Sequence, residues 1–189
     1  MKKNFVFAAA VAVLGMAFTV SAQKAPADFS GKWNLDLAKS KLTDREKASI
    51  ESQTITVTQT AADIKLETAT KRVAPPAGAP AGGPPGGGGG GGMMGGGGAP
   101  APQIFQLGKE TTVEQTMGQN TVPVKMGSKW DGSKLVLSTS RTFSGPNGEM
   151  TSTTKETWEL GADGKTLTVN REAVSPRGTD TTTKVFTKS

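Results

Sequence analysis

The fold is decided by residues Lys129 to Val174, which read KWDGSKLVLSTSRTFSGPNGEMTSTTKETWELGADGKTLTVNREAV. Runs rich in Thr, Val, Leu and Trp are separated here by Asp131-Gly132, Asn147-Gly148 and Asp163-Gly164. These dipeptides reach positive φ at little cost, which suits the tight turns that join antiparallel strands. The stretch therefore predicts a meander of β-hairpins.

The residues after Gly132 alternate as a β-strand does. One face carries Leu135, Leu137, Thr139, Arg141 and Phe143. This face changes from apolar to polar along its length, as does the face Ile64, Leu66, Thr68 and Thr70. A barrel packed at one end and lined by Thr, Ser and Met at the other would have an open mouth. Threonines that are merely good strand formers on a solvated sheet face would give the same pattern.

The rest of the chain extends this sheet on both sides. Further strands are expected at 28–37, 52–60, 62–73, 121–130 and 179–188, with 103–107 and 111–117 as one broken strand. Thr43 and Glu46 match a capping box, which predicts a short helix there, although a charged loop is an alternative. The total is about nine or ten strands.

Such a sheet must curl or split, because its apolar face needs cover and the sequence predicts no long helix to provide it. An up-and-down barrel and a sandwich both satisfy this need. Short hairpins between consecutive strands favour the barrel. The predicted fold class is therefore all-β, an antiparallel up-and-down meander closing into a barrel.

Two segments are expected to lie outside this barrel. Residues 1–22 resemble an export signal: Lys2 and Lys3 precede an apolar run, and Val20-Ser21-Ala22 offers a cleavage site. We expect a periplasmic or secreted protein with no transmembrane segment once the signal is removed. Residues 74–102 hold 14 Gly and 7 Pro, a composition typical of disorder. We therefore expect one domain, 23–189, interrupted by a disordered loop.

The composition argues against catalysis. The sequence has no Cys, no His and no Tyr, which removes the usual nucleophiles, general bases and metal ligands. We expect no enzyme activity, no cofactor and no metal, although Met93-Met94 in the Gly-rich run could contact copper(I). The net charge of +6 falls to +4 without Lys2 and Lys3. The excess is modest and export argues against a nucleic-acid partner.

The charged residues of the strands are interpreted as solvated sheet faces. The basic residues concerned are Lys129, Lys134, Arg141, Lys155, Lys165, Arg171 and Lys184. The carboxylates concerned are Asp131, Glu156, Glu159, Asp163 and Glu172.

The phrases Gly31-Lys32-Trp33, K-W-D-G-x-K-L and E-T-W-E-L-x-A-D-G-K-T-L carry a resemblance. The chain resembles the lipocalin and calycin-like barrels, and among them small extracytoplasmic bacterial proteins grouped as lipocalin-like. The resemblance implies that Gly31 and Trp33 seal the closed end of the barrel. It also implies a late arginine over the tryptophan, for which Arg171 is a candidate. The T-D-Y turn of the lipocalins is missing.

Two functions remain open at this point. The first is a non-enzymatic module that holds a small apolar or amphipathic ligand, with Met126, Thr139, Phe143 and Trp158 as candidate lining residues. The second is an envelope or surface interaction protein in which residues 74–102 contact a partner and the barrel is a scaffold.

Overall fold

The computed structural model describes residues 26–74, 101–117, 120–145 and 148–189. The export signal expected at 1–22 and the loop expected at 74–102, except for its end residues, lie outside the described residues. The Met93-Met94 pair lies outside them as well.

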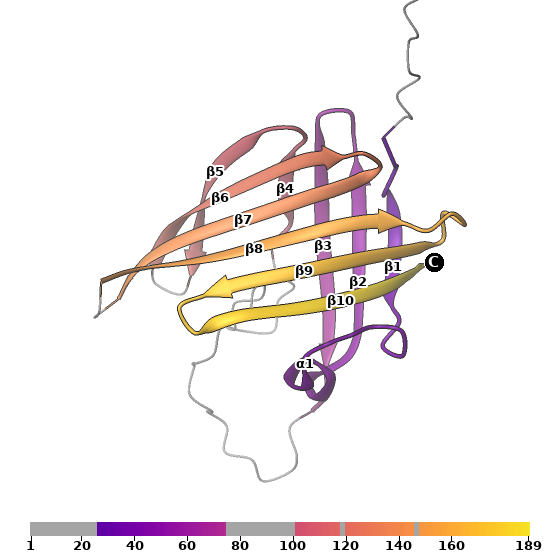
Figure 1. Cartoon of the computed structure of the whole chain (residues 1–189), viewed down its shortest axis with the longest axis horizontal. Coiled ribbons are helices and arrows are strands. Elements are labelled where there is room, and N and C mark those ends of the chain that lie inside the picture. The colour runs from indigo at the N-terminus through magenta and orange to yellow at the C-terminus, as the bar shows by residue number, and fades with distance from the viewer. Residues whose placement is uncertain (1–25, 75–100, 118–119, 146–147) are drawn as a thin grey trace, which may run out of the picture.

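Ten antiparallel strands and one helix make up the described chain (Figure 1). They are β1 (Gly31–Leu35), α1 (Asp44–Ser49), β2 (Ile50–Gln59), β3 (Asp63–Arg72), β4 (Gln103–Gln106), β5 (Glu110–Met117), β6 (Asn120–Asp131), β7 (Lys134–Gly145), β8 (Gly148–Leu160), β9 (Thr166–Ser175) and β10 (Gly178–Lys188). Each of β6 to β10 pairs with the strand before it, and β10 pairs with β1. The expected up-and-down barrel is confirmed, with ten strands.

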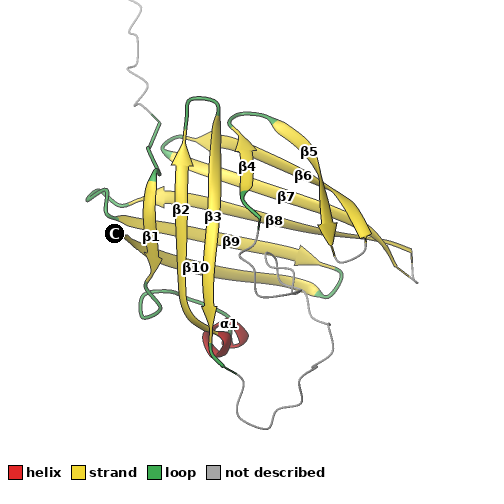
Figure 2. Ribbon diagram, turned by 180° about the vertical axis from the view of Figure 1, so that it is seen from behind, coloured by secondary structure: helices red, strands yellow, loops and turns green. Residues whose placement is uncertain are grey.

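The sheet nearly closes on itself between β4 and β5 (Figure 2). Residues 103–107 and 111–117, expected to form one broken strand, belong to two strands at opposite ends of the strand order. A turn joins them, and the Ser128 side chain of β6 forms hydrogen bonds with that turn. The Ser128 hydroxyl donates to the Gln106 carbonyl over 2.8 Å and accepts from the Gly108 amide over 3.0 Å. This contact links the two ends of the sheet.

Local chemistry sets where several elements begin and end. The capping box is confirmed: the Thr43 hydroxyl accepts from the Glu46 amide, and the Glu46 carboxylate accepts from the Thr43 amide. The first strand is shorter than the expected 28–37. It ends at Leu35 because the Asp36 carboxylate accepts from the amides of Ala38 and Lys39, which turns the chain.

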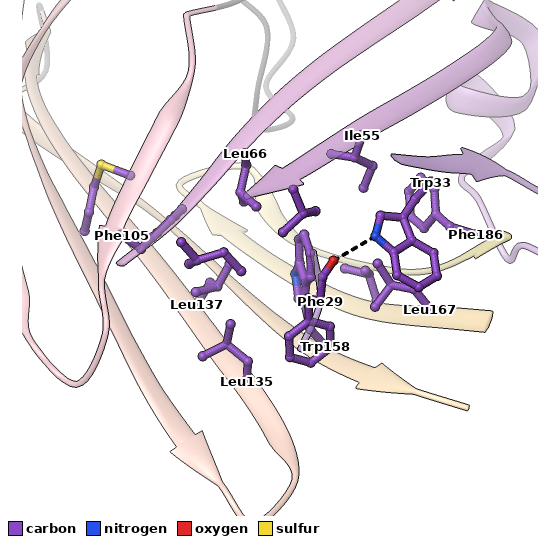
Figure 3. Packing of buried hydrophobic residues seen from close by; sticks show 14 of the residues in the cluster. Phe29, Trp33, Ile55, Leu66, Phe105, Leu135, Leu137, Trp158, Leu167 and Phe186 are labelled. Carbon is purple, nitrogen blue, oxygen red and sulfur yellow. Dashed lines mark hydrogen bonds between the residues drawn. The ribbon is translucent and has the colours of Figure 1, made fainter. Parts of the chain in front are cut away.

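The hydrophobic core gathers toward one end of the barrel. Figure 3 shows how its side chains pack against one another. Phe29, although outside the strands, is fully buried and lies among three aromatic side chains. Its ring stacks on Trp130 at 6.1 Å and meets Trp158 edge-on at 5.9 Å, and its carbonyl accepts a 2.9 Å bond from the Trp33 indole. Each such side chain stabilises the fold by roughly 1.5–3 kcal/mol through burial, so this cluster anchors the barrel.

Candidate ligand-binding site

The inward-facing side chains change character along the strands. On β7, Leu135 and Leu137 are buried at 0% and 2% exposure, Thr139 and Arg141 are half-buried, and Phe143 is 38% exposed. The same change recurs along β3 and β8. The barrel interior therefore has a packed apolar end and a half-buried polar end.

The four candidate lining residues do not form one cluster. Met126 lies opposite Thr139 on the neighbouring strand, so the structure brings these two together. Trp158 lies at the packed end, opposite Leu135 and against Phe29, with 1% exposure. Phe143 lies toward the β7–β8 turn, at the polar end. Of the four, Met126 and Thr139 mark the boundary between the two ends.

The two residues expected at the closed end lie beside the last strand. Trp33 is fully buried, and the ammonium group of Lys188 lies 5.1 Å from its ring centroid. Gly31 has φ +134°, and a Cβ there would lie 2.6 Å from Cε of Lys188. The expectation that Arg171 covers the tryptophan is wrong, because Lys188 lies over the ring and Arg171 pairs with Glu156 elsewhere.

The expectation of solvated strand charges is also wrong for several residues. Arg141 is half-buried, and the side chains of Arg171 and Lys184 are only 10% and 16% exposed. Glu156, expected in water, is 28% exposed at its side chain. These residues alternate with outward-facing neighbours and occupy inward positions of β7, β8, β9 and β10.

A polar row crosses three adjacent strands at the start of the polar end. Glu156 faces Arg171, and Arg171 faces Thr182. The Glu156 carboxylate accepts a 3.0 Å bond from the Trp158 indole through Oε2, and its Oε1 lies 3.8 Å from Nε of Arg171. Glu156 thus connects the aromatic core to the interior arginine.

Several donors in this region are buried without a partner in the described part of the chain. They are Nε of Arg141, Nη2 of Arg171 and Oγ1 of Thr182. Burial lowers the pKa of Arg141, and the positive charge of Arg171 lowers it further. Arginine nevertheless stays protonated at physiological pH, so the two guanidinium groups are both charged.

A second ion pair joins the helix to the last strand. Nζ of Lys184 lies 3.3 Å from Oε1 of Glu46 and 3.4 Å from Oε1 of Gln53. Burial raises the pKa of Glu46, but the charge of Lys184 and the hydrogen bonds from Thr43 outweigh it, so the pKa lies below its ordinary value. The charge of Lys184 is therefore balanced by the nearby Glu46 carboxylate, whereas Arg141 forms no ion pair within the described residues.

Two open grooves lie on the outer face of the sheet. The larger, of about 610 Å³, runs over Gly127 and Ser138 and is bordered by Lys125, Lys129 and Lys155. The smaller, of about 340 Å³, lies over the outward residues Thr157, Asn170 and Thr183 and their neighbours. Both are lined mainly by short polar side chains and lysines. Such a lining is better matched to water than to an apolar ligand.

The described ranges hold no cluster of three or more acidic side chains that could bind a metal ion. They also hold no helix long and apolar enough to cross a bilayer.

Comparison with known proteins adds one structural likeness. No family model and no curated protein sequence matches the chain. Among solved structures, it is similar to zebrafish ileal bile acid-binding protein in complex with cholic acid. The TM-score is 0.46 and the identity 16%, over 85% of this chain and 98% of that one. On its own strand order, the described part of the chain is an all-β antiparallel, nearly closed barrel of ten strands.

Proposed function

We propose that this chain is an exported, non-enzymatic binding protein that holds a small apolar or amphipathic ligand at the polar end of its barrel. The proposed export rests on the signal-like sequence of residues 1–22. The absence of Cys, His and Tyr from the whole sequence supports a role without catalysis.

One observation carries the proposal: the main cluster of large apolar side chains fills one end of the interior. Beyond Leu137, the inward positions of β7 pass to Thr139 and Arg141, and those of β8 between Trp158 and the turn are all half-buried. Inward-facing strand residues that serve only stability are usually apolar and closely packed. A half-buried interior with polar groups at its edge is what an amphipathic ligand requires.

Native mass spectrometry of the mature protein, purified from the exported fraction, tests this proposal. We expect a reproducible adduct of small-molecule mass that organic solvent releases. Titration of the stripped protein with an environment-sensitive apolar dye should then give saturable, one-site fluorescence enhancement. A clean unliganded mass together with no uptake of the dye would refute the proposal.

The envelope-interaction alternative makes a different prediction for the same protein. Deletion of residues 76–100 should leave dye uptake and the circular dichroism spectrum unchanged if the barrel is the working part. If the segment is the working part, the full mature chain should capture envelope partners in a pull-down and the deletion variant should not. Neither of these two proteins should then take up the dye.

A further inference from the structure

The larger of the two outer grooves lies over β6, β7 and β8, which run side by side in the sheet (Figure 1). The register of these strands sets the charge of the groove. Gly127 of β6 lies opposite Ser138 of β7, and Ser138 lies opposite Lys155 of β8. Lys125 and Lys129 stand on either side of Gly127 and share its face of β6. The three lysines therefore surround the Gly127–Ser138 pair.

The spacing of these three lysines follows from sheet geometry. With about 3.4 Å per residue along a strand and about 4.8 Å between strands, their Cα atoms lie roughly 12–14 Å apart. All three residues are exposed. None of them forms an ion pair in the part of the chain that the structure describes. Their ammonium groups are thus available to anions from solution.

The groove is positive overall. Its lining holds four lysines, of which the fourth is Lys109 in the turn before β5, against the single glutamate Glu110, which leaves a charge of +3. Glu172 of β9 lies opposite Lys155, but it forms no ion pair within the described ranges. A concave surface that carries mainly one sign of charge concentrates its field and attracts counter-ions.

Gly127 is the residue that leaves the groove open. It lies within the twelve-residue strand β6 and is not one of the glycines with positive φ, so the backbone there does not require a glycine. A Cβ at this position would lie 2.8 Å from Oγ of Ser138. A glycine inside a strand weakens the strand, and it often marks a place where a ligand comes close to the backbone.

We propose that this groove binds an acidic polysaccharide, on a surface separate from the barrel interior. Lysines whose Cα atoms lie roughly 12–14 Å apart can each meet a different charge along a linear polyanion. Serine and threonine hydroxyls in the lining, including that of Ser138, can exchange hydrogen bonds with sugar hydroxyls.

Other polyanions fit the groove less well. Among the described residues that line it, none is aromatic, and the apolar side chain of Val136 is only 6% exposed. Single-stranded nucleic acids stack their bases on aromatic side chains, protein interfaces depend on aromatic and arginine anchors, and bilayers take up exposed apolar side chains. The groove offers charge and hydroxyl groups without such anchors, which favours a polysaccharide.

The test measures binding of the full mature chain to dextran sulfate, neutral dextran, polyglutamate and vesicles that contain phosphatidylglycerol. The three anionic probes are compared at equal concentrations of negative charge. We expect dextran sulfate to bind most tightly and neutral dextran not to bind. Added salt should weaken the binding of dextran sulfate, because the Debye length falls from about 10 Å at 0.1 M to about 3 Å at 1 M. Tighter binding of polyglutamate or of the vesicles would overturn the assignment to a polysaccharide.

A charge variant tests the position of the site. Each lysine beside a polyanionic surface contributes a factor of about five in affinity, so combining Lys125→Gln, Lys129→Gln and Lys155→Gln should weaken the binding of dextran sulfate about thirtyfold or more.

The matched control removes the same charge from exposed positions outside the groove. It combines Lys32→Gln, Lys165→Gln and Arg177→Gln, and none of these residues forms an ion pair within the described ranges. We expect a loss of less than about threefold for it, because charges beyond about 10 Å are screened. Equal losses in the two combined variants would overturn the groove as the binding site.

A second variant tests the groove without changing its charge. Gly127→Thr places a good strand former over the groove and should weaken the binding of dextran sulfate by about tenfold, because the polysaccharide can no longer approach the backbone closely. Unchanged affinity in a variant that circular dichroism shows to be folded would overturn the proposal. Dye uptake by the interior should be the same in all variants, so a failure of this proposal leaves the proposed ligand-binding function standing.

Discussion

Ser128 offers a direct test of how the barrel closes. Its side chain is 8% exposed and connects β6 to the turn between β4 and β5. Its hydroxyl donates to the Gln106 carbonyl over 2.8 Å and accepts from the Gly108 amide over 3.0 Å. Ser128→Ala removes both hydrogen bonds and leaves two part-buried backbone groups without these partners.

The magnitude follows from these two contacts. A hydrogen bond contributes about 1 kcal/mol net, and a buried group left unpaired costs about 1–3 kcal/mol. Solvent can reach part of the turn, because Gln106 and Gly108 lie at the surface or close to it. We therefore expect Ser128→Ala to lower the free energy of unfolding by about 2 kcal/mol. In a chain of this size, each kcal/mol shifts Tm by roughly 2–4 °C.

Urea unfolding followed by tryptophan fluorescence measures this loss. Ser138→Ala is the control, because Ser138 is exposed and donates a single 3.4 Å bond to the Gly127 carbonyl. We expect it to change the free energy of unfolding by less than about 0.5 kcal/mol. Equal effects of the two variants would show that Ser128 does not close the barrel.

Three further predictions follow from other contacts. Phe29→Ala should lower the free energy of unfolding, measured in urea, by about 3–5 kcal/mol. It should also shift tryptophan emission to longer wavelength, since Phe29 is fully buried and contacts Trp158. Unchanged emission would contradict this packing. Arg141→Met should leave the stability of the ligand-free protein equal or higher, because it removes a half-buried charge and keeps an apolar stem; a loss above about 2 kcal/mol would mean a structural role. The pKa of Glu46 is lowered because the charge of Lys184 and the capping hydrogen bonds outweigh the effect of burial. The stabilising effect of Glu46 is therefore present above its ordinary pKa of about 4.5 and is lost as pH falls through the lower pKa of the folded state. Glu46→Gln should make stability less pH-dependent in that window, and an unchanged acid profile would contradict the pairing.

The fold could be predicted from local signals because hairpin turns and strand alternation are encoded in neighbouring residues. Gly132 and Gly164 have φ of +60° and +62°, as their turn dipeptides predict. The position of β4 could not be predicted in the same way. Its pairing with β3 spans residues 73–102, and the closure through Ser128 depends on a contact across 22 residues to Gln106.

The sequence contains part of the signal for the candidate site, although the strand charges are not solvated as expected. The alternation Leu135, Leu137, Thr139 and Arg141 already places the arginine on the apolar face. The run Leu167, Val169, Arg171 and Ala173 does the same on β9. The spacing of the basic residues along the chain does not reveal this signal, because the exposure of a strand residue depends on the face of the strand that it occupies. Their proximity could not be predicted, since it depends on register across β8.

The interior is divided into a packed apolar end and a half-buried polar end. This division explains how the barrel can be stable with charged groups inside it and without a disulfide. The sequence contains no cysteine, so burial and hydrogen bonding must supply the stability. The aromatic cluster around Phe29 concentrates that burial at one end. Glu156 lies at the boundary, since it binds the Trp158 indole on one side and faces Arg171 on the other. The packed end therefore holds Glu156 of the polar row in place through the Trp158 indole. The arginines lie beyond it, at positions where the fold does not depend on apolar packing.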